Sequence, residues 1–251
     1  MTNNFGFVNE DEMANGLNNK KVSELSQNLK HMMKNLFGAL DDEKEVTCVK
    51  TEEPIKPDII IQYDGKEINV SLKSGGAEIV HEEHIDSFVS FLKEQGISKT
   101  TIDTILYFQF GDGTLDGTGQ KRMPYEKLMY LLASRIRKAN YELNSNKDFI
   151  LKFVERCIFK GAKPENLAAD YIYHGSVYYG NVVGKKELLF YVQNKEWQWY
   201  KSLHIGPLMI KPHARYVDRP IISEKRRHQV DVSWPKFYAV LDYISRRYSV
   251  I

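Results

Sequence analysis

The chain has 251 residues, of which 42% are hydrophobic and 27% are charged. This composition is ordinary for a globular protein with a sizeable core, and no run of apolar residues is long enough to cross a membrane. The first residues are polar and acidic, without the pattern of a signal peptide. The two cysteines, Cys48 and Cys157, are too few for a disulfide framework or a cysteine-based zinc site. We therefore expect a cytoplasmic protein with reduced thiols and no membrane association.

The formal net charge of +2 is unevenly distributed along the chain. Residues 201–251 carry ten Lys and Arg against four Asp and Glu, a net charge of +6, which leaves −4 for residues 1–200. A basic final fifth after an acidic body indicates a polyanionic partner, although a solvated basic surface would have the same composition.

The first half of the chain predicts a helix, three strands and a second helix. Residues 1–17 are expected to form a loosely packed leader. Apolar residues then recur every three or four positions from Val22 to Leu36, as in an amphipathic helix. The Asp64-Gly65 pair is typical of a tight β-hairpin turn between two strands. Strands are predicted at 45–50, 57–63 and 66–74, and a helix that ends before Gly96 is predicted over 80–95.

The second half is richer in β-type segments. A glycine-rich loop at 111–122 precedes a helix that opens at Pro124, and another helix is predicted over 147–160. A final short helix is predicted over 235–247. Four further segments are predicted as strands: 171–179, 187–193, 207–217 and 228–234. We predict one α/β domain over 1–251, with a mixed central sheet flanked by helices over 21–110 and a helical and β-rich C-terminal elaboration over 111–251.

The residues with the greatest chemical potential lie between positions 56 and 83. On the predicted strand 66–74, side chains alternate between a polar and an apolar face. The polar face carries Glu67, Asn69, Ser71 and Lys73, and the apolar face carries Ile68, Val70 and Leu72. Asp58 starts the neighbouring strand. The apolar row is expected to hold the hairpin on the core and to leave Lys73 and its neighbours on a face that can bind a substrate.

In this segment the sequence resembles the PD-(D/E)xK nuclease superfamily, whose shared core is a helix, then strands in a hairpin, then a helix. Pro57-Asp58 matches the first part of the motif and Ser71-Leu72-Lys73 the second, with twelve residues between Asp58 and Ser71. The resemblance covers residues 21–95 and implies a restriction-endonuclease-like core. It also implies that Asp58 binds Mg²⁺, with Mn²⁺ as a substitute, and that Lys73 orients or activates the water that attacks the scissile phosphate.

The chain departs from the superfamily pattern at Ser71, where the motif has Asp or Glu. Some restriction enzymes of the superfamily have Ser-x-Lys and take the missing carboxylate from the following helix, which implies Glu82 or Glu83 here. The alternatives are Glu67 on the strand and Glu24 on the first helix. The expected catalytic set is Asp58, Ser71, Lys73, Glu82 and Glu83, with Asp58, Glu82 and Glu83 as metal ligands.

Two basic segments are candidates for contact with the DNA backbone. One is the loop 111–122, whose four glycines permit close approach and which ends in Lys121 and Arg122. The other contains Lys211, Arg215, Lys225, Arg226 and Arg227, which could bind phosphate or guanine. An ordinary solvated surface is the alternative for both. The aromatic residues of 171–200 are expected to pack a sheet more than to stack on bases.

The resemblance and these features together imply an endonuclease that hydrolyses phosphodiester bonds of double-stranded DNA. Its size is similar to that of small type II restriction enzymes, and we expect a monomer or homodimer without an organic cofactor. Three alternatives stay open: a sequence-independent repair or junction-resolving nuclease, a catalytically inactive DNA-binding module, and a protein-interaction domain with no nucleic-acid role.

Overall fold

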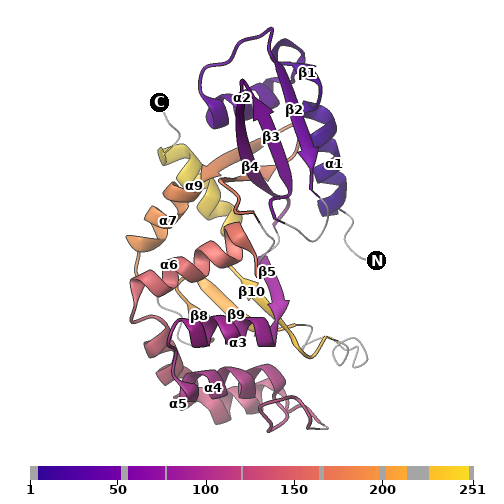
Figure 1. Ribbon diagram of the computed structural model, residues 1–251. Helices are drawn as coiled ribbons and strands as arrows, with labels where there is room; N and C mark the ends of the chain where they lie inside the picture. The colour runs from indigo at the N-terminus through magenta and orange to yellow at the C-terminus, as the bar shows by residue number, and fades with distance from the viewer. Residues whose placement is uncertain are drawn as a thin grey trace. The chain divides into compact units, whose positions relative to one another are not determined.

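The chain forms two compact units, each assembled from separate segments (Figure 1). The structure, a computed structural model, describes residues 5–51, 56–76, 78–119, 121–163, 167–197, 202–213 and 226–248. Unit 1 consists of Met1–Ala77, Ile158–Tyr191 and Lys236–Ile251, and unit 2 of Glu78–Cys157 and Val192–Pro235. Among the helices in these described ranges, none has the length and apolar character needed to cross a membrane.

Unit 1 is built on a six-stranded mixed sheet with the strand order β1-β2-β3-β4-β6-β7. Its strands are β1 (Lys20–Lys21), β2 (Glu45–Lys50), β3 (Ile59–Tyr63), β4 (Lys66–Lys73), β6 (Tyr171–Gly175) and β7 (Gly180–Gly184). β4 and β6 are parallel, and the other neighbours are antiparallel. The predicted hairpin is confirmed: Asp64 and Gly65 have φ of 51° and 74°, which matches a tight turn between twisted strands.

Helices flank the sheet of unit 1: α1 (Phe5–Leu17), the 3₁₀ turn η1 (Val22–Glu24), α2 (Gln27–Phe37), α7 (Lys185–Gln193) and α9 (Phe237–Tyr248). The prediction of a loosely packed leader is wrong, because Met13 and Leu17 of α1 are fully buried in the core with Leu29 and Met33 of α2. α2 starts later than predicted, since the Ser26 hydroxyl caps it by accepting a hydrogen bond from the Leu29 N–H.

The predicted strand at 187–193 is a second error, because these residues belong to α7. Leu188 and Val192 are its buried side chains, and their spacing of four positions is that of a helical face. The predicted final helix is confirmed as α9, which packs against β7. Asn181 of β7 donates a hydrogen bond to Asp242 of α9 at 3.3 Å.

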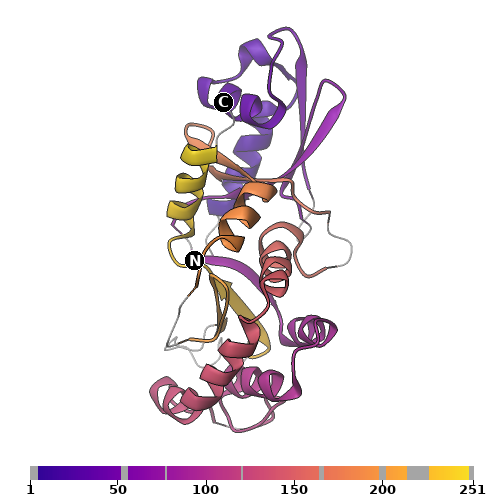
Figure 2. The same ribbon diagram turned by 90° about the vertical axis from the view of Figure 1, so that its left-hand side faces the viewer.

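Unit 2 contains a four-stranded antiparallel sheet with the order β5-β10-β9-β8. The strands are β5 (Ile79–His84), β8 (His204–Ile205), β9 (Leu208–Pro212) and β10 (Gln229–Ser233). The helices are α3 (Ile85–Glu94), α4 (Lys99–Phe110), α5 (Tyr125–Leu143) and α6 (Lys147–Glu155). The π-helical turn η2 (Arg156–Lys160) follows α6, and its last three residues belong to unit 1. α4 and α5 pack against each other, as Figures 1 and 2 both show.

The helix predicted over 80–95 is correct only in its second part. Residues 79–84 form β5, and α3 starts after His84, whose Nδ1 accepts a hydrogen bond from the Asp86 N–H at 3.3 Å. β5 is a strand because it pairs with β10, which lies far along the chain. Glu82 and Glu83 therefore lie on a strand, where their side chains point to opposite faces of the sheet.

Candidate functional site

Asp58 is held at the start of β3 by bonds to both neighbouring strands. Its N–H donates to the Val70 carbonyl at 3.1 Å, and its carbonyl accepts from the Thr51 N–H at 3.2 Å. Its Oδ2 accepts hydrogen bonds from the Ser71 hydroxyl at 2.9 Å and from the Leu72 N–H at 2.6 Å. The carboxylate is thus fixed beside β4, and its Oδ1 has no hydrogen-bond partner among the described residues.

Lys56 lies next to this carboxylate. Its Nζ donates to the Ser71 hydroxyl oxygen at 2.9 Å and lies 4.0 Å from Oδ2 of Asp58. The fully buried Ser71 hydroxyl links the Lys56 amine to the Asp58 carboxylate, because it accepts from the first and donates to the second. Burial and the positive charge of Lys73 lower the pKa of Lys56 to about 7, against the opposing effects of Asp58 and Glu10. Lys56 was not predicted from the sequence, although its position directly before Pro57-Asp58 was a usable signal.

Lys73 ends β4 opposite His174 on the parallel strand β6. The His174 Nε2 lies 2.9 Å from the Gly75 carbonyl oxygen. The predicted apolar face is confirmed, because Val70 and Leu72 are buried in the core and Ile68 is partly buried against it. On the polar face Ser71 is fully buried, whereas Glu67 is exposed and Asn69 and Lys73 are partly exposed, so close to Asp58 the accessible polar residue of β4 is Lys73.

A helix acid that acts on this group is Glu10 of α1, which no sequence pattern had identified. Its charge raises the pKa of Lys56, and its Oε2 lies 3.4 Å from the Lys50 amine at the end of β2. Glu24, an alternative from the sequence, instead caps η1. Glu67, the other alternative, accepts a hydrogen bond from the Gln62 amide at the hairpin end of β4. Asp58, Ser71, Lys73, Lys56 and Glu10 therefore form the candidate site of unit 1.

Glu83 lies in unit 2, where it forms a buried ion pair with Arg156. The Arg156 Nη2 donates to Oε2 at 2.6 Å and the Arg156 Nε to Oε1 at 3.3 Å, and the Glu83 side chain is 1% exposed. Burial raises the pKa of this carboxyl, but the interactions with His81 and Arg156 outweigh it and hold the pKa below its ordinary value. The predicted role of Glu83 as a metal ligand beside Asp58 stays a prediction.

Glu82 also lies in unit 2, in a group of metal-ligating residues of its own. It pairs across the sheet with Asp231 of β10. His213, directly after β9, has its Nδ1 2.5 Å from Oδ1 of Asp231 and 4.0 Å from Oε2 of Glu82. The Arg226 Nη1 contacts the other ring nitrogen, Nε2, at 2.8 Å. Burial raises the pKa of Asp231, against the effect of His213.

The two predicted DNA-binding segments are in contact in unit 2 through Arg227. Its Nη2 donates to the Gly119 carbonyl at 2.9 Å and lies 3.1 Å from Oδ2 of Asp112. These contacts hold the loop 111–122 against Arg227. The Arg227 side chain is 12% exposed, so little of its charge is accessible to solvent.

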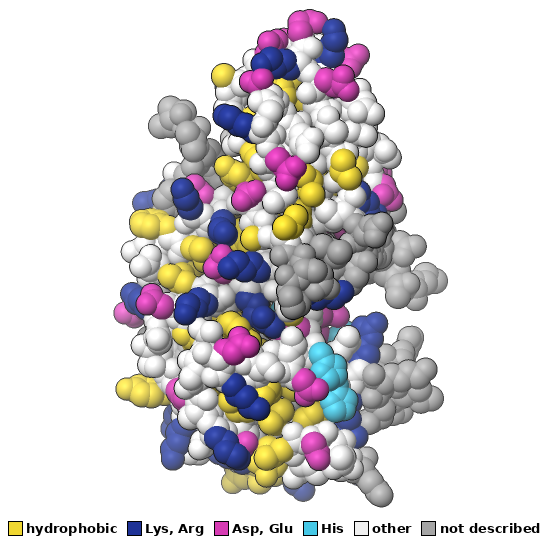
Figure 3. Space-filling view, viewed as in Figure 1, with side chains coloured by type: hydrophobic (Ala, Val, Ile, Leu, Met, Phe, Trp, Pro, Cys, Tyr) yellow, Lys and Arg dark blue, Asp and Glu magenta, His cyan; other side chains and the backbone are white. Residues whose placement is uncertain are grey.

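The other basic candidates differ in exposure. Lys121 and Arg226 are exposed, Arg122 and Lys211 are partly exposed, and Arg215 and Lys225 lie outside the described residues. On the face drawn in Figure 3, Lys and Arg side chains are scattered among Asp and Glu and do not form one continuous patch.

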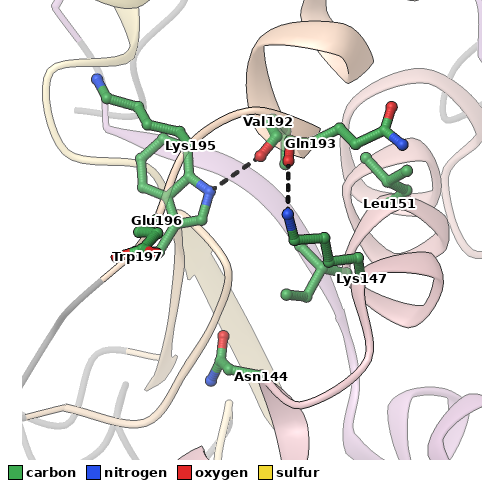
Figure 4. A pocket seen from close by; sticks show the side chains of 9 residues that line it. Asn144, Lys147, Leu151, Val192, Gln193, Lys195, Glu196 and Trp197 are labelled. Atoms are coloured by element: carbon green, nitrogen blue, oxygen red, sulfur yellow. Dashed lines mark hydrogen bonds between the residues drawn. The ribbon is translucent and has the colours of Figure 1, made fainter.

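Unit 2 also has a pocket of about 230 Å³ between the start of α6 and the segment after α7 (Figure 4). Lys147 donates to the Gln193 carbonyl and the Trp197 indole N–H to the Val192 carbonyl, both at 3.3 Å. None of the predicted catalytic or DNA-binding residues lines this pocket, and we assign it no part in the candidate site.

No protein-family model fits the sequence, and no curated protein is significantly similar to it. The interpretation of the site therefore depends on its geometry and chemistry.

Proposed function

We propose that this chain is a Mg²⁺-dependent endonuclease that hydrolyses phosphodiester bonds of double-stranded DNA, with Asp58 and Lys73 in its active site. The observation that supports the proposal best is the grouping of Asp58, Ser71 and Lys73 on adjacent strands of a mixed sheet that is flanked by helices. The resemblance of residues 21–95 to the PD-(D/E)xK superfamily implies the same grouping. We further propose that the core is restriction-endonuclease-like and that cleavage is sequence-specific.

The residues of the candidate site fit a hard divalent cation. Mg²⁺ is typically held by one or two carboxylates together with substrate phosphates and water. Asp58 offers Oδ1, which has no partner among the described residues, and Glu10 is a second carboxylate close to the same Lys56 amine. When bound, the ion supplies positive charge to the transition state of phosphodiester hydrolysis and makes water more acidic. Mn²⁺ prefers the same oxygen ligands and is expected to substitute.

The neighbouring side chains would position and charge the site. The bonds from Ser71 and Leu72 hold the Asp58 carboxylate in one orientation, which lowers the cost of ordering it when substrate binds. Lys73 carries its ammonium at the accessible end of β4, where it would stabilise negative charge on the phosphate and orient the attacking water. Lys56 has a pKa of about 7, so its amine can hold or release a proton at neutral pH.

Contacts to the DNA backbone are proposed for the exposed basic residues of unit 2. Lys121 and Arg226 are exposed and lie in the two segments that Arg227 joins through Gly119. Phosphate contacts of this kind hold a protein on the duplex and carry no sequence information directly.

The proposal is tested by incubating the purified full chain with plasmid DNA, with Mg²⁺ and with EDTA. Cleavage that requires Mg²⁺ is expected. Discrete fragments would support a restriction enzyme, whereas a smear would favour the sequence-independent repair-type nuclease. Intact DNA with every divalent ion tried, together with tight binding, would identify an inactive DNA-binding module, for which Ser71 in place of an acid is the supporting observation. Intact DNA without binding would contradict both.

Two pairs of variants separate chemistry from general charge effects. Asp58→Ala and Lys73→Ala are each expected to lower the cleavage rate by at least about a hundredfold, the scale for removing one group that stabilises transition-state charge. Asp64→Ala and Lys66→Ala are the matched controls, because these residues lie in the same hairpin and are exposed. The controls are expected to cleave at the rate of the unmodified chain. Equal loss in a variant and its control would refute the assigned roles.

A further inference from the structure

Unit 2 holds a second group of side chains that can ligate a metal ion, separate from the candidate site of unit 1. Glu82 comes from β5, Asp231 from β10, and His213 directly follows β9. These three strands are neighbours in the sheet, so residues far apart in sequence meet on one face. One ligand atom from each residue lies within 4.8 Å of the ligand atoms of the other two.

The two carboxylates of this group repel each other, and a bound cation would relieve that repulsion. Glu82 and Asp231 stand directly opposite each other on adjacent strands, an arrangement in which like charges repel. The Asp231 side chain is only 11% exposed, which makes the repulsion harder for water to screen. Arg226 bonds to Nε2 of His213, the ring nitrogen that does not contact Asp231. Lys211, opposite Asp231 on β9, makes no ion pair within the described part of the chain.

We propose that Glu82, His213 and Asp231 bind one divalent transition-metal ion, and that Zn²⁺ is the best match. One imidazole nitrogen with two carboxylate oxygens is a mixed ligand set that Zn²⁺ accepts, whereas Mg²⁺ and Ca²⁺ prefer oxygen ligands alone. Three protein ligands leave a fourth tetrahedral position for water or an anion. The Glu82 side chain is 42% exposed, so solvent reaches this carboxylate. The buried thiols of Cys48 and Cys157 are not part of the group.

Metal binding at His213 requires two of its present hydrogen bonds to change. Arg226 can only donate, so Nε2 accepts and the ring proton lies on Nδ1, from which it is donated to Asp231. An ion at Nδ1 requires the lone pair of that nitrogen, so the proton has to move to Nε2. Arg226 then loses its acceptor. Metal binding would therefore release the Arg226 guanidinium, one of the exposed basic groups proposed to contact DNA.

The test measures Zn²⁺ binding to the full-length Asp58→Ala chain by calorimetric titration, after EDTA treatment and dialysis. This background lacks the principal metal ligand proposed in unit 1, and the readout does not depend on DNA cleavage. Binding of one Zn²⁺ per chain is expected, with at least tenfold weaker binding after His213→Ala. Glu82→Gln should give a similar loss, and because Glu82 is partly exposed this variant retains the fold even if His213→Ala does not.

Matched controls are His31→Ala and Glu94→Gln, which alter exposed residues of the same types outside the group and should leave the affinity unchanged. X-ray absorption of the Zn²⁺-loaded chain is expected to show nitrogen and oxygen ligands without sulfur. The proposal is overturned by no Zn²⁺ binding, by equal affinity in Glu82→Gln and Glu94→Gln, or by sulfur ligands. Because none of these results involves DNA or Mg²⁺, failure here would leave the proposed nuclease activity untouched.

Discussion

Replacing Glu83 with alanine is expected to destabilise the fold by about 3–5 kcal/mol, because it leaves a buried guanidinium without its counter-ion. The side chains of Glu83 and Arg156 are 1% and 17% exposed, so water cannot easily replace the missing carboxylate. Arg156 also packs on the Phe91 ring, 4.9 Å from its centroid, which restricts its movement towards solvent. Glu82→Ala should cost less than about 1 kcal/mol, because that side chain is 42% exposed.

The loss expected for Glu83→Ala is a large share of the free energy of unfolding of a typical protein, which is roughly 5–15 kcal/mol. Denaturant unfolding of the two variants, followed by circular dichroism, measures the difference directly. A Glu83→Ala variant within about 1 kcal/mol of the unmodified chain would refute the reasoning. The result also bears on catalysis. If Glu83→Ala is unstable, its loss of cleavage reflects unfolding. Only a stable but inactive variant would implicate Glu83 in metal binding.

The same ion pair has a pH dependence of known sign. The folded-state pKa of Glu83 is depressed, since the interactions with His81 and Arg156 outweigh burial. Its contribution to stability is therefore fully present above the unfolded-state pKa of about 4.3 and is lost as the pH falls through the lower folded-state pKa. The stability difference between the unmodified chain and Glu83→Gln should accordingly narrow in acid. A difference that widens as the pH falls would contradict the assignment.

Three further changes test other parts of the structure. Ser71→Ala should lower the free energy of unfolding by about 1–3 kcal/mol, measured with denaturant, because it leaves buried polar partners unpaired. Arg227→Ala should make the loop 111–122 more sensitive to limited proteolysis, while Arg226→Ala should not, since of these two residues only Arg227 bonds to the described part of that loop. Neutralising Lys121 and Arg226 together should weaken the salt dependence of DNA affinity. The slope of log affinity against log salt concentration should decrease in magnitude by about one for each phosphate contact that is lost. An unchanged slope would mean that these two residues belong to a solvated surface that does not contact DNA.

The elements predicted correctly are those whose cause is local. The hairpin of β3 and β4 follows from Asp64-Gly65 and the alternation around it, and this register is what brings Asp58 next to Ser71. β5 and α1 were not predicted because their causes are tertiary. β5 is a strand through its pairing with β10, and α1 is ordered by burial of Met13 in the core.

The residues of the candidate site also fall into two classes, those that local sequence predicts and those that tertiary packing brings in. The motif residues on adjacent strands could be predicted, since strand register is encoded close to them. The position of Glu10 depends on how α1 packs, and the partner of Glu83 is Arg156, 73 positions away. No local pattern contains such information. The Glu82, His213 and Asp231 group is hidden for the same reason, because three strands must first be brought together.

The parallel pairing of β4 with β6 has a consequence for biosynthesis. Asn69 and Asp170 bond to each other across this pair although they are 101 positions apart, and most of unit 2 is encoded between them. During N-to-C-terminal synthesis, the edge of β4 that pairs with β6 stays unpaired until the intervening residues have been synthesised. Unpaired strand edges promote aggregation, and pairing over such separations is slow. Fragments that end before residue 171 should therefore be poorly soluble when expressed, including a fragment limited to residues 21–110.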